Sequence, residues 1–368
     1  MSIAYRAFSR FRDIVMQIAI DRSIRHVRYV HFMQLDKFAP SYLAFLRDHY
    51  DMSQHLVLIK GAPGCALPFK MRNVYRVNYF FRWLFLYRPF VNYKVKSVRK
   101  FIFHSLFDYE VVKYFSRESE LLRQKGWWFI YGADLYTPPN DRDNVFVRSN
   151  VKGIITDTDG DDIVMMKKYS CHPSVIRAGY AFPVSWSMIE TAVRERPAHD
   201  YVRVQINNSC DGSIIPALET LARFRDQNIK VRVILSYGKF DKEKVRAVGQ
   251  SIFGDKFEPI DEFLAPAEYA KKMAENDILI LNHNRQQGLG NCFAALACGV
   301  KLFIRSEVTT SAHLKSKGCS VYATEDLSSL SWETFVSYPE SDRLASRTNS
   351  RRFFDDSYLK SLWDPVFS

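Results

Sequence analysis

Hydrophobic residues in the second half of the chain occur in short runs separated by stretches of helical character. Six runs predict strands: "YVRVQI" (201–206), "KVRVIL" (230–235), "KFEPI" (256–260), "DILIL" (277–281), "VKLFI" (300–304) and "CSVY" (319–322). Helices are expected between them, near 213–226, 241–252, 266–275, 291–298 and 311–317, with Ser213 as a cap and Pro266 at an early helical position. Strands that alternate with helices predict a parallel sheet covered on both faces, which is a doubly wound domain.

The first half shows the same rhythm less clearly, with strands expected at 26–33, 55–60, 100–106, 127–132 and 151–156. We interpret the polar, proline-bearing stretch 181–200 as a linker. The expected domains are therefore 1–180 and 201–338, followed by an aromatic helical tail, 339–368, that packs back on the first domain. The predicted fold class is α/β, with two Rossmann-like doubly wound domains facing across a cleft.

The net charge of +12 is concentrated in one window of the sequence. From Met52 to Phe107 the chain has no Asp or Glu but ten Lys and Arg residues. Within this window, nine of the nineteen residues of "YRVNYFFRWLFLYRPFVNY" (75–93) are aromatic. Arginines interleaved with large aromatic rings suit the headgroup region of an anionic bilayer. The side chains expected to face such a membrane are Arg76, Arg82, Trp83 and Arg88.

Two other interpretations of this window stay open. Basic aromatic surfaces also bind single-stranded nucleic acid, and a packed core helix can carry arginines whose charged ends reach solvent. Near the N-terminus a helical stripe, consisting of Phe8, Phe11, Val15 and Ile18, fits either a membrane-surface helix or a packed helix.

The remaining composition favours a cytoplasmic protein. No window of 18 residues is free of charge, so we expect no spanning helix. The first fifteen residues carry arginines where a secretory signal needs an apolar region. The six cysteines include no CxxC and no zinc-like spacing, so we expect reduced thiols and no metal site built from them.

The stretch "LNHNRQQGLGNCFAALACG" (281–299) combines a strand end, a polar turn and a helix of small residues. Its glycines, Gly288 and Gly290, would let the backbone approach a ligand closely. The helix that follows offers unpaired N–H groups and the positive end of its dipole, which together suit a phosphate. The side chains expected to contribute are Arg285 as a bidentate phosphate ligand, and Gln286, Gln287 and Asn291 as polar contacts. The alternative is an ordinary helix start with Arg285 in a structural salt bridge.

Two more polar loops follow strands of the same predicted sheet. "NNSCDGS" (207–213) follows the first of these strands, and "SYG" (236–238) follows the second. Their candidate donor-binding residues are Asn208, Ser209, Asp211, Ser213, Ser236, Tyr237 and Gly238. Asn, Ser and Asp also favour turns for local reasons, but three polar loops at one sheet edge together indicate a ligand site.

These loops resemble a known family, the TDP-N-acetylfucosamine:lipid II N-acetylfucosaminyltransferases of glycosyltransferase family 56. The resemblance rests on "RQQGLGN", "NSCDGS", "LSYG" and, in the first half, "GADLY" (132–136), and it extends from about residue 26 to about residue 325. Two positions depart from the family pattern, in which glycines stand where this chain has Asn207 and Ala133.

The resemblance implies a GT-B architecture with the nucleotide-sugar donor in the second domain and the acceptor in the first. It also implies a polyprenyl-diphosphate-linked saccharide as acceptor, at the cytoplasmic face of the inner membrane, in the assembly of a surface polysaccharide such as enterobacterial common antigen or O-antigen. Residues 285–291 would then hold the donor diphosphate, and loops 208–213 and 236–238 would line the nucleotide or the sugar. Other functions left open are a polysaccharide pyruvyltransferase on a similar scaffold and a basic nucleic-acid-binding protein.

Sugar transfer requires that the leaving diphosphate be stabilised and that the acceptor hydroxyl be aligned or deprotonated. A helix N-terminus and Arg285 can stabilise the diphosphate without a metal or another cofactor. A carboxylate or histidine of the first domain can act as the base. The candidates near strand ends are Asp134, Asp36 and His104, each of which could instead be a turn residue, a cap or a binding group.

One motif favours a different mechanism. "DTDGDD" (157–162) contains Asp157 and Asp159 in the spacing by which metal-dependent GT-A enzymes hold Mg²⁺ or Mn²⁺, and hard carboxylates suit those ions. The spacing fails as a calcium loop, because Gly160 is misplaced and Lys168 stands where a glutamate is needed. We interpret the motif as an acidic turn that caps a helix at 161–168.

Overall fold

The computed structural model describes residues 18–20, 22–61, 70–77, 95–139, 141–207, 213–236 and 240–368. The chain forms two compact units. The first unit comprises Met1–Asp157, Asp161–Ala181 and Leu359–Ser368, and the second comprises Thr158–Gly160 and Phe182–Tyr358. Among the described residues, no helix is long and apolar enough to cross a bilayer.

The first unit is built on a seven-stranded, fully parallel sheet of order β3-β2-β1-β4-β5-β6-β7. The strands are β1 Tyr29–Gln34, β2 His55–Lys60, β3 Val74–Val77, β4 Lys100–His104, β5 Gly126–Phe129, β6 Gly153–Ile155 and β7 Ser174–Ile176. The five strands expected from hydrophobic runs are all present. Strands β3 and β7 were not predicted, because they are only four and three residues long and include a single buried residue between them, which gives no apolar run.

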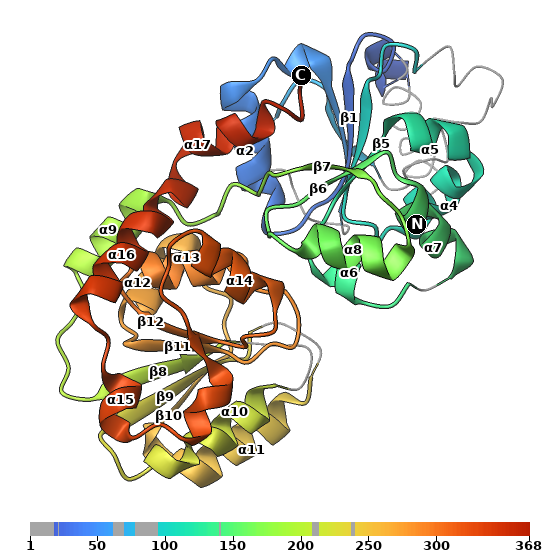
Figure 1. Ribbon diagram of the computed structural model, residues 1–368. Helices are drawn as coiled ribbons and strands as arrows, with labels where there is room; N and C mark the ends of the chain where they lie inside the picture. The colour runs from blue at the N-terminus through green and yellow to red at the C-terminus, as the bar shows by residue number, and fades with distance from the viewer. Residues whose placement is uncertain are drawn as a thin grey trace, which may run out of the picture. The chain divides into compact units, whose positions relative to one another are not determined.

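Helices cover both faces of this sheet (Figure 1). The helices are α2 Ala39–His49, α4 Tyr109–Arg117, α5 Ser119–Lys125, α6 Ala133–Tyr136, α7 Arg142–Asn150 and α8 Asp161–Tyr169. On one face α4, α5, α7 and α8 bury apolar side chains against Phe32, Phe103 and Trp128. On the other face α2 and the C-terminal residues 359–368 pack against Met33, Ile102 and other strand residues. The alternation of side chains along each strand divides the core in this way.

The second unit contains a six-stranded parallel sheet of order β10-β9-β8-β11-β12-β13. Its strands are β8 Val202–Ile206, β9 Ile229–Ile234, β10 Phe257–Ile260, β11 Ile278–Leu281, β12 Lys301–Ile304 and β13 Tyr322–Ala323. Its helices include α10 Ile214–Leu221, α11 Lys242–Phe253, α12 Pro266–Ala274, α13 Leu289–Ala297, α14 Thr309–Ser316 and α15 Trp332–Val336. The predicted α/β class with two doubly wound parallel sheets is confirmed.

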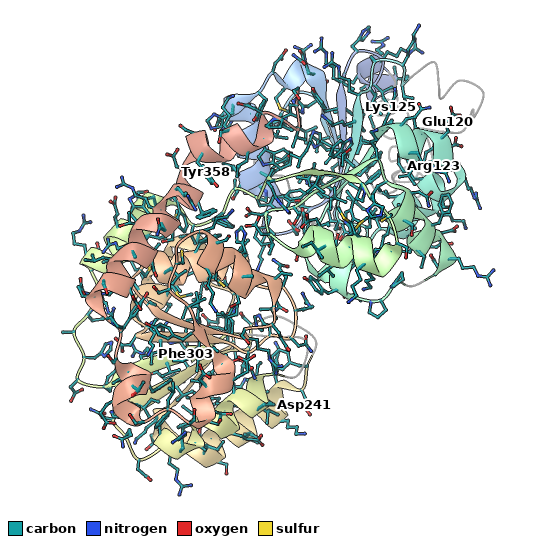
Figure 2. All side chains as sticks on the ribbon, in the orientation of Figure 1. Glu120, Arg123, Lys125, Asp241, Phe303 and Tyr358 are labelled. Carbon is teal, nitrogen blue, oxygen red and sulfur yellow. The ribbon has the colours of Figure 1, made fainter. Side chains whose placement is uncertain are left out.

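Local sequence explains where individual elements of the second unit begin and pack. Asp241, labelled in Figure 2, accepts a hydrogen bond from the backbone N–H of Lys244 at 2.9 Å and so starts α11. Pro266 occupies the first turn of α12, as predicted. Phe303, also labelled in Figure 2, lies on β12 with its ring 5.6 Å from that of Phe335 in α15.

The expected linker and tail differ from the structure. The stretch 181–200 contains helix α9 (Trp186–Arg194), whose buried Ile189 and Ala192 join the apolar core that also holds α12 and α13. The apolar stripe of this helix was masked in the sequence by the polar residues around it. The tail 339–368 is divided between the two units. Helix α16 (Glu340–Arg351) packs on α13 in the second unit. Residues 359–368, including the end of α17 (Asp356–Trp363), belong to the first unit.

Strand order marks one point in each sheet where a ligand is expected. In both sheets the chain reverses its direction of winding beside the first strand, between β1 and β4 and between β8 and β11. At this point the two neighbouring strands connect to helices on opposite faces of the sheet. In folds of this kind, ligands bind beyond the carboxyl ends of these two strands. The loops to consider are therefore those after β1 and β4 in the first unit and after β8 and β11 in the second.

Candidate functional site

The turn between β11 and α13 is tight and requires a glycine at one position. Gly288 is the N-cap residue of α13 and has a φ of 73°, which an L side chain rarely adopts. A Cβ atom on Gly288 would lie 3.2 Å from Cδ2 of Leu281 and 3.5 Å from the side-chain nitrogens of both Asn207 and Asn291. The turn therefore gathers two amide side chains beside the start of the helix, one of them from the end of β8.

Helix α13 presents its N-terminus at this turn and is held rigidly. Residues 292–298 are all buried, and the first backbone bond of the helix runs from the N–H of Cys292 to the carbonyl of Gly288 at 3.0 Å. The preceding N–H groups, of residues 289–291, have no partner within the helix. Fixed N–H groups and the positive end of the dipole favour an anion here.

Arg285 brings a positive charge to the same turn. The residue is half-buried, and its Nη1 donates to the carbonyl of Gln286 at 2.9 Å. Within the described part of the chain it forms no ion pair with a carboxylate, so the predicted alternative of a structural salt bridge is not found there. A guanidinium that is oriented by its own loop and keeps its charge suits phosphate recognition.

Two buried polar atoms at this turn lack protein partners. Gln286 is 8% exposed and Asn207 is 2% exposed. Neither Oε1 of Gln286 nor Nδ2 of Asn207 has a hydrogen-bond partner among the residues that the structure describes. Leaving such groups unsatisfied costs about 1–3 kcal/mol each, so a polar ligand is the expected compensation. Asn207 was not among the residues predicted from the sequence, although it is the first polar residue after β8.

Gly290 has a different role from the one expected. A Cβ atom on Gly290 would lie 3.1 Å from two ring carbons of Phe182. The ring of Phe182 therefore occupies the space beside this glycine, which allows the helix to pack rather than a ligand to approach. The expectation of a close ligand approach is corrected for Gly290 and stays a prediction for Gly288.

The two other predicted donor loops are only partly described. Asn208, Ser209 and Asp211 lie outside the described residues, and so do Tyr237 and Gly238. Ser213 is buried at the start of α10, and its carbonyl accepts a hydrogen bond from Nδ2 of Asn282 at 3.2 Å. Ser236 follows β9 at the same edge of the sheet. Gln287 lies in the turn itself and is half-buried.

A small cavity of about 170 Å³ lies at the same edge of the second sheet, and its polar lining was not predicted from the sequence. Arg305 donates from Nε to Oδ1 of Asn282 at 3.0 Å, and Glu325 accepts from the backbone N–H of Ser306 at 3.1 Å. Burial raises the pKa of Glu325, but hydrogen bonds from backbone amides outweigh it and lower that pKa. Asn282 and Arg305 each directly follow a strand, which is the signal that could have found them.

In the first unit, Asp36 is half-buried beyond the end of β1. It follows β1 and accepts hydrogen bonds through Oδ1 from the N–H groups of Phe38 at 2.9 Å and Ala39 at 3.0 Å, which orders the start of α2. Its Oδ2 has no hydrogen-bond partner in the described ranges. Burial raises the pKa of Asp36, and the backbone hydrogen bonds only partly offset this effect.

Asp134, the first candidate base, is a structural residue. It is fully buried, and both oxygens are engaged: Oδ2 accepts from Nε1 of Trp128 at 2.6 Å and from the N–H of Leu106 at 3.3 Å, and Oδ1 accepts from the N–H of Tyr131 at 2.9 Å. Burial raises the pKa of this carboxyl. A carboxylate without access to solvent cannot take a proton from a bound acceptor, so the expectation is corrected.

His104 is also unsuited to the role expected of it. Its Nδ1 lies 2.7 Å from the hydroxyl of Tyr180, and its Nε2 lies 3.0 Å from Nδ1 of His31. Nε2 of His31 in turn lies 3.0 Å from Nδ1 of His55, so three buried imidazoles form a hydrogen-bonded chain across the sheet face. Burial lowers the pKa of His104 to about 3 and that of His55 to about 4. The chain is neutral near pH 7 and belongs to the core.

The acidic motif 157–162 forms the start of α8, as predicted, and its carboxylates have protein partners. Oδ2 of Asp159 lies 3.2 Å from Nδ1 of His313 and 3.1 Å from Nζ of Lys317. Asp161 accepts from the hydroxyl of Tyr136, and Asp162 pairs with Arg177, both at 2.8 Å. No group of three or more His, Cys, Asp or Glu residues in the described ranges is arranged to hold a metal ion.

Little of the predicted membrane-facing surface is described. Arg76 lies in the edge strand β3, whereas Arg82, Trp83 and Arg88 lie outside the described residues. The N-terminal stripe lies outside them as well, except for Ile18, which is 49% exposed.

Comparison with known proteins agrees with this fold. The family described as 4-alpha-L-fucosyltransferase, glycosyl transferase group 56, matches residues 90–366, so the chain belongs to this family. No curated protein gives a significant match. The chain is a glycosyltransferase of the GT-B architecture, and the family resemblance noted in the sequence is confirmed at that level.

Solved structures of glycosyltransferases share the fold over nearly the whole chain. WaaG, a glycosyltransferase involved in lipopolysaccharide biosynthesis, is 15% identical, with a TM-score of 0.56 over 92% of this chain and 98% of that one. A UDP-forming α,α-trehalose-phosphate synthase from Burkholderia xenovorans is 12% identical, with a TM-score of 0.59 over 93% and 98%. A glycosyltransferase from Rickettsia africae ESF-5 is 9% identical, with a TM-score of 0.61 over 92% and 97%. At these identities the similarity concerns the fold alone.

Proposed function

We propose that the protein transfers a fucosamine-like amino-deoxy sugar from a dTDP or UDP donor to a polyprenyl-diphosphate-linked saccharide, without a metal ion, during the assembly of a bacterial surface polysaccharide. The observation that carries the proposal is the turn 285–291, in which Arg285 and the N-terminus of α13 follow β11, beside the point where the sheet reverses its winding between β8 and β11. Membership of glycosyl transferase group 56 supports sugar transfer as the reaction.

The turn would stabilise the leaving group. When the bond between the anomeric carbon and the diphosphate oxygen breaks, negative charge develops on that oxygen. The N–H groups at the start of α13 and the guanidinium of Arg285 lie fixed before the reaction, so they stabilise this charge without reorganisation. The amides of Asn207 and Asn291 lie beside Gly288 and supply further donors.

The first unit would bind the acceptor and remove its proton. Asp36 lies beyond the carboxyl end of β1, beside the point where the sheet reverses its winding. As the acceptor oxygen attacks the anomeric carbon, its proton passes to the carboxylate of Asp36. A pKa raised by burial makes Asp36 a stronger base than an exposed aspartate.

The basic aromatic window 75–93, together with the lipid of the proposed acceptor, supports binding to an anionic membrane surface. We infer the cytoplasmic face of the inner membrane, with the protein bound peripherally. The role of WaaG in lipopolysaccharide biosynthesis is consistent with this setting.

Isothermal titration calorimetry with dTDP and UDP, with and without EDTA, tests the proposal. We expect saturable binding that EDTA leaves unchanged. Arg285→Ala should weaken binding about tenfold to a hundredfold, because charge-assisted hydrogen bonds contribute about 1.5–3 kcal/mol. Arg225→Ala, at an exposed arginine in the same unit, is the control and should bind as the wild type does. Absence of nucleotide binding by a folded wild-type protein would refute the proposal.

A further inference from the structure

The residue that follows β4 has an unusual backbone. Ser105 has a φ of 75°, in the left-handed region that residues other than glycine rarely adopt. It is half-buried, and its N–H donates to the carbonyl of Phe129 at 3.1 Å. Its Oγ has no hydrogen-bond partner among the residues described. Glycine would adopt this conformation without strain, which makes the hydroxyl of Ser105 a candidate for a function at this position.

Ser105 and Asp36 lie at the same crevice of the first sheet. Strands β1 and β4 are adjacent and parallel, with Phe32 paired to Phe103. Asp36 follows the end of β1 and Ser105 follows the end of β4, so both residues lie at the same edge of the sheet. This edge lies where the sheet reverses its winding, at which open α/β sheets bind ligands.

Two buried side chains hold the strained turn by hydrogen bonds to the backbone of Leu106, the residue that follows Ser105. The N–H of Leu106 donates to Oδ2 of Asp134 at 3.3 Å, and its carbonyl accepts from Nδ2 of Asn144 at 3.2 Å. Asp134 is fully buried, and Asn144 is 6% exposed. On the other side, His104 is fixed by Tyr180 and His31. A strained backbone conformation persists only where the surrounding contacts hold it in place. Such conformations concentrate at functional sites.

We propose that Ser105 is an acceptor-binding residue whose Oγ hydrogen-bonds the acceptor saccharide and directs its reacting hydroxyl to Asp36. Asp134 and Asn144 are the positioning residues that hold Ser105 in this conformation. The inference rests on the proposed function, since it specifies how the first unit grips the acceptor. It also explains why the aspartate of "GADLY" is buried: it acts on the acceptor through Leu106 and Ser105.

Three variants test the inference. Ser105→Ala removes the hydroxyl and keeps the strain, Ser105→Gly removes both, and Ser170→Gly relieves a similar strain (φ 50°) at an exposed position after α8 as a matched control. The assay measures sugar transfer from dTDP-N-acetylfucosamine to a farnesyl-diphosphate-linked N-acetylhexosamine disaccharide. The concentration of this acceptor is varied to obtain its KM. Melting temperature and dTDP affinity are measured for each protein.

Loss of the Ser105 hydroxyl and relief of the backbone strain should affect different quantities, the acceptor KM and the melting temperature. Ser105→Ala should keep the wild-type melting temperature and dTDP affinity while raising the acceptor KM about tenfold, the effect of one lost hydrogen bond. Ser105→Gly should raise the acceptor KM equally and raise the melting temperature by about 2 °C. Ser170→Gly should show the same thermal gain with wild-type kinetics.

Asn144→Ala tests the clamp separately. It should raise the acceptor KM on its own but add little in the Ser105→Ala background, because both changes then act on one contact. A purely structural role for Asn144 would instead give additive effects on kinetics.

An unchanged acceptor KM in Ser105→Ala would overturn the inference and leave the proposed function intact. A melting temperature of Ser105→Gly at or below that of the wild type would show that the turn is unstrained, which also contradicts it. A folded wild-type protein that binds no dTDP or UDP would refute the proposed function, and the acceptor role of Ser105 with it.

Discussion

The carboxylate of Asp134 accepts a hydrogen bond from the indole N–H of Trp128 at 2.6 Å, inside a core in which both side chains are fully buried. Because the other oxygen of Asp134 is also engaged, by the N–H of Tyr131, the residue ties β5 to the turn that follows it. A residue with this environment stabilises the fold and acts on the reaction only through the backbone that it holds.

Asp134→Asn should therefore lower the free energy of unfolding by about 2–3 kcal/mol, because an amide nitrogen would face an N–H donor in a buried site. Urea unfolding measures the change. The dTDP affinity of the folded fraction should stay at the wild-type value. Wild-type stability in this variant would show that Asp134 is not part of a satisfied buried network.

Asp36→Asn should lower kcat by about a hundredfold to ten-thousandfold, the usual contribution of a general base, with an unchanged melting temperature. The wild-type kcat/KM should fall as pH decreases through the pKa of Asp36, which burial places above the ordinary value of 3.8, because only the carboxylate accepts a proton. This acidic limb should be absent in Asp36→Asn. A variant that keeps both the wild-type rate and the wild-type pH profile would exclude Asp36 as the base.

The histidine chain predicts a loss of stability in acid. The pKa values of His104 (about 3) and His55 (about 4) lie below the ordinary value of 6.5, so between these values the unfolded chain binds more protons than the folded one. Stability should be full above pH 6.5 and should fall as pH decreases from 6.5 towards 4, with a slope of up to about 1.4 kcal/mol per pH unit for each histidine. His55→Leu should give a shallower slope in urea titrations at pH 7 and 5. An equal slope in both proteins would mean that His55 titrates normally in the folded state.

Gly288→Ala should destabilise the second unit and weaken nucleotide binding, because the added Cβ meets Leu281 at 3.2 Å and the φ of 73° disfavours alanine. The expected backbone cost is about 1–2 kcal/mol. Gly254→Ala is the control: its φ of 52° and ψ of −129° impose a backbone cost at least as large, away from the site and with nothing within 4 Å. Calorimetry should show weaker dTDP binding for the first variant only; equal losses in both would point to instability rather than to the site.

The basic aromatic window predicts binding to anionic vesicles. Charge reversal at Arg82 and Arg88 should reduce flotation with phosphatidylglycerol vesicles, since each basic residue near such a surface contributes about 1 kcal/mol. An oligonucleotide gel shift run in parallel separates this interpretation from nucleic-acid binding, which would be tight and steeply dependent on salt. Strong oligonucleotide binding without flotation would contradict the membrane assignment.

The fold was largely predictable because central parallel strands are apolar on both sides. Runs such as "HLVLIK" at β2 and "DILIL" at β11 stand out for that reason, and helices between them imply the parallel sheet. The edge strands β3 and β7 escaped notice because exposure on one side removes the apolar run. Helix α9 was hidden because only a narrow stripe, including Ile189 and Ala192, is buried.

The candidate site was predictable where local chemistry alone defines it. Gly288 followed by a helix predicts a tight turn at a helix N-terminus from sequence, because positive φ and helix N-termini are local properties. Asp36, Asp134 and His104 all lie near strand ends, and only the packing around each shows that Asp134 and His104 are buried and engaged whereas Asp36 is only half-buried. Ser105 carried no signal, since its conformation is imposed by Asp134 and Asn144, which are distant in the sequence.

The most direct test of the account is a crystal structure of the protein soaked with dTDP or a dTDP-sugar. We expect density for the diphosphate at the N-terminus of α13, with its oxygens within hydrogen-bond distance of the backbone N–H groups of 289–291 and of the guanidinium of Arg285. Nucleotide density elsewhere, with this turn empty or filled by the protein's own side chains, would contradict the central claim.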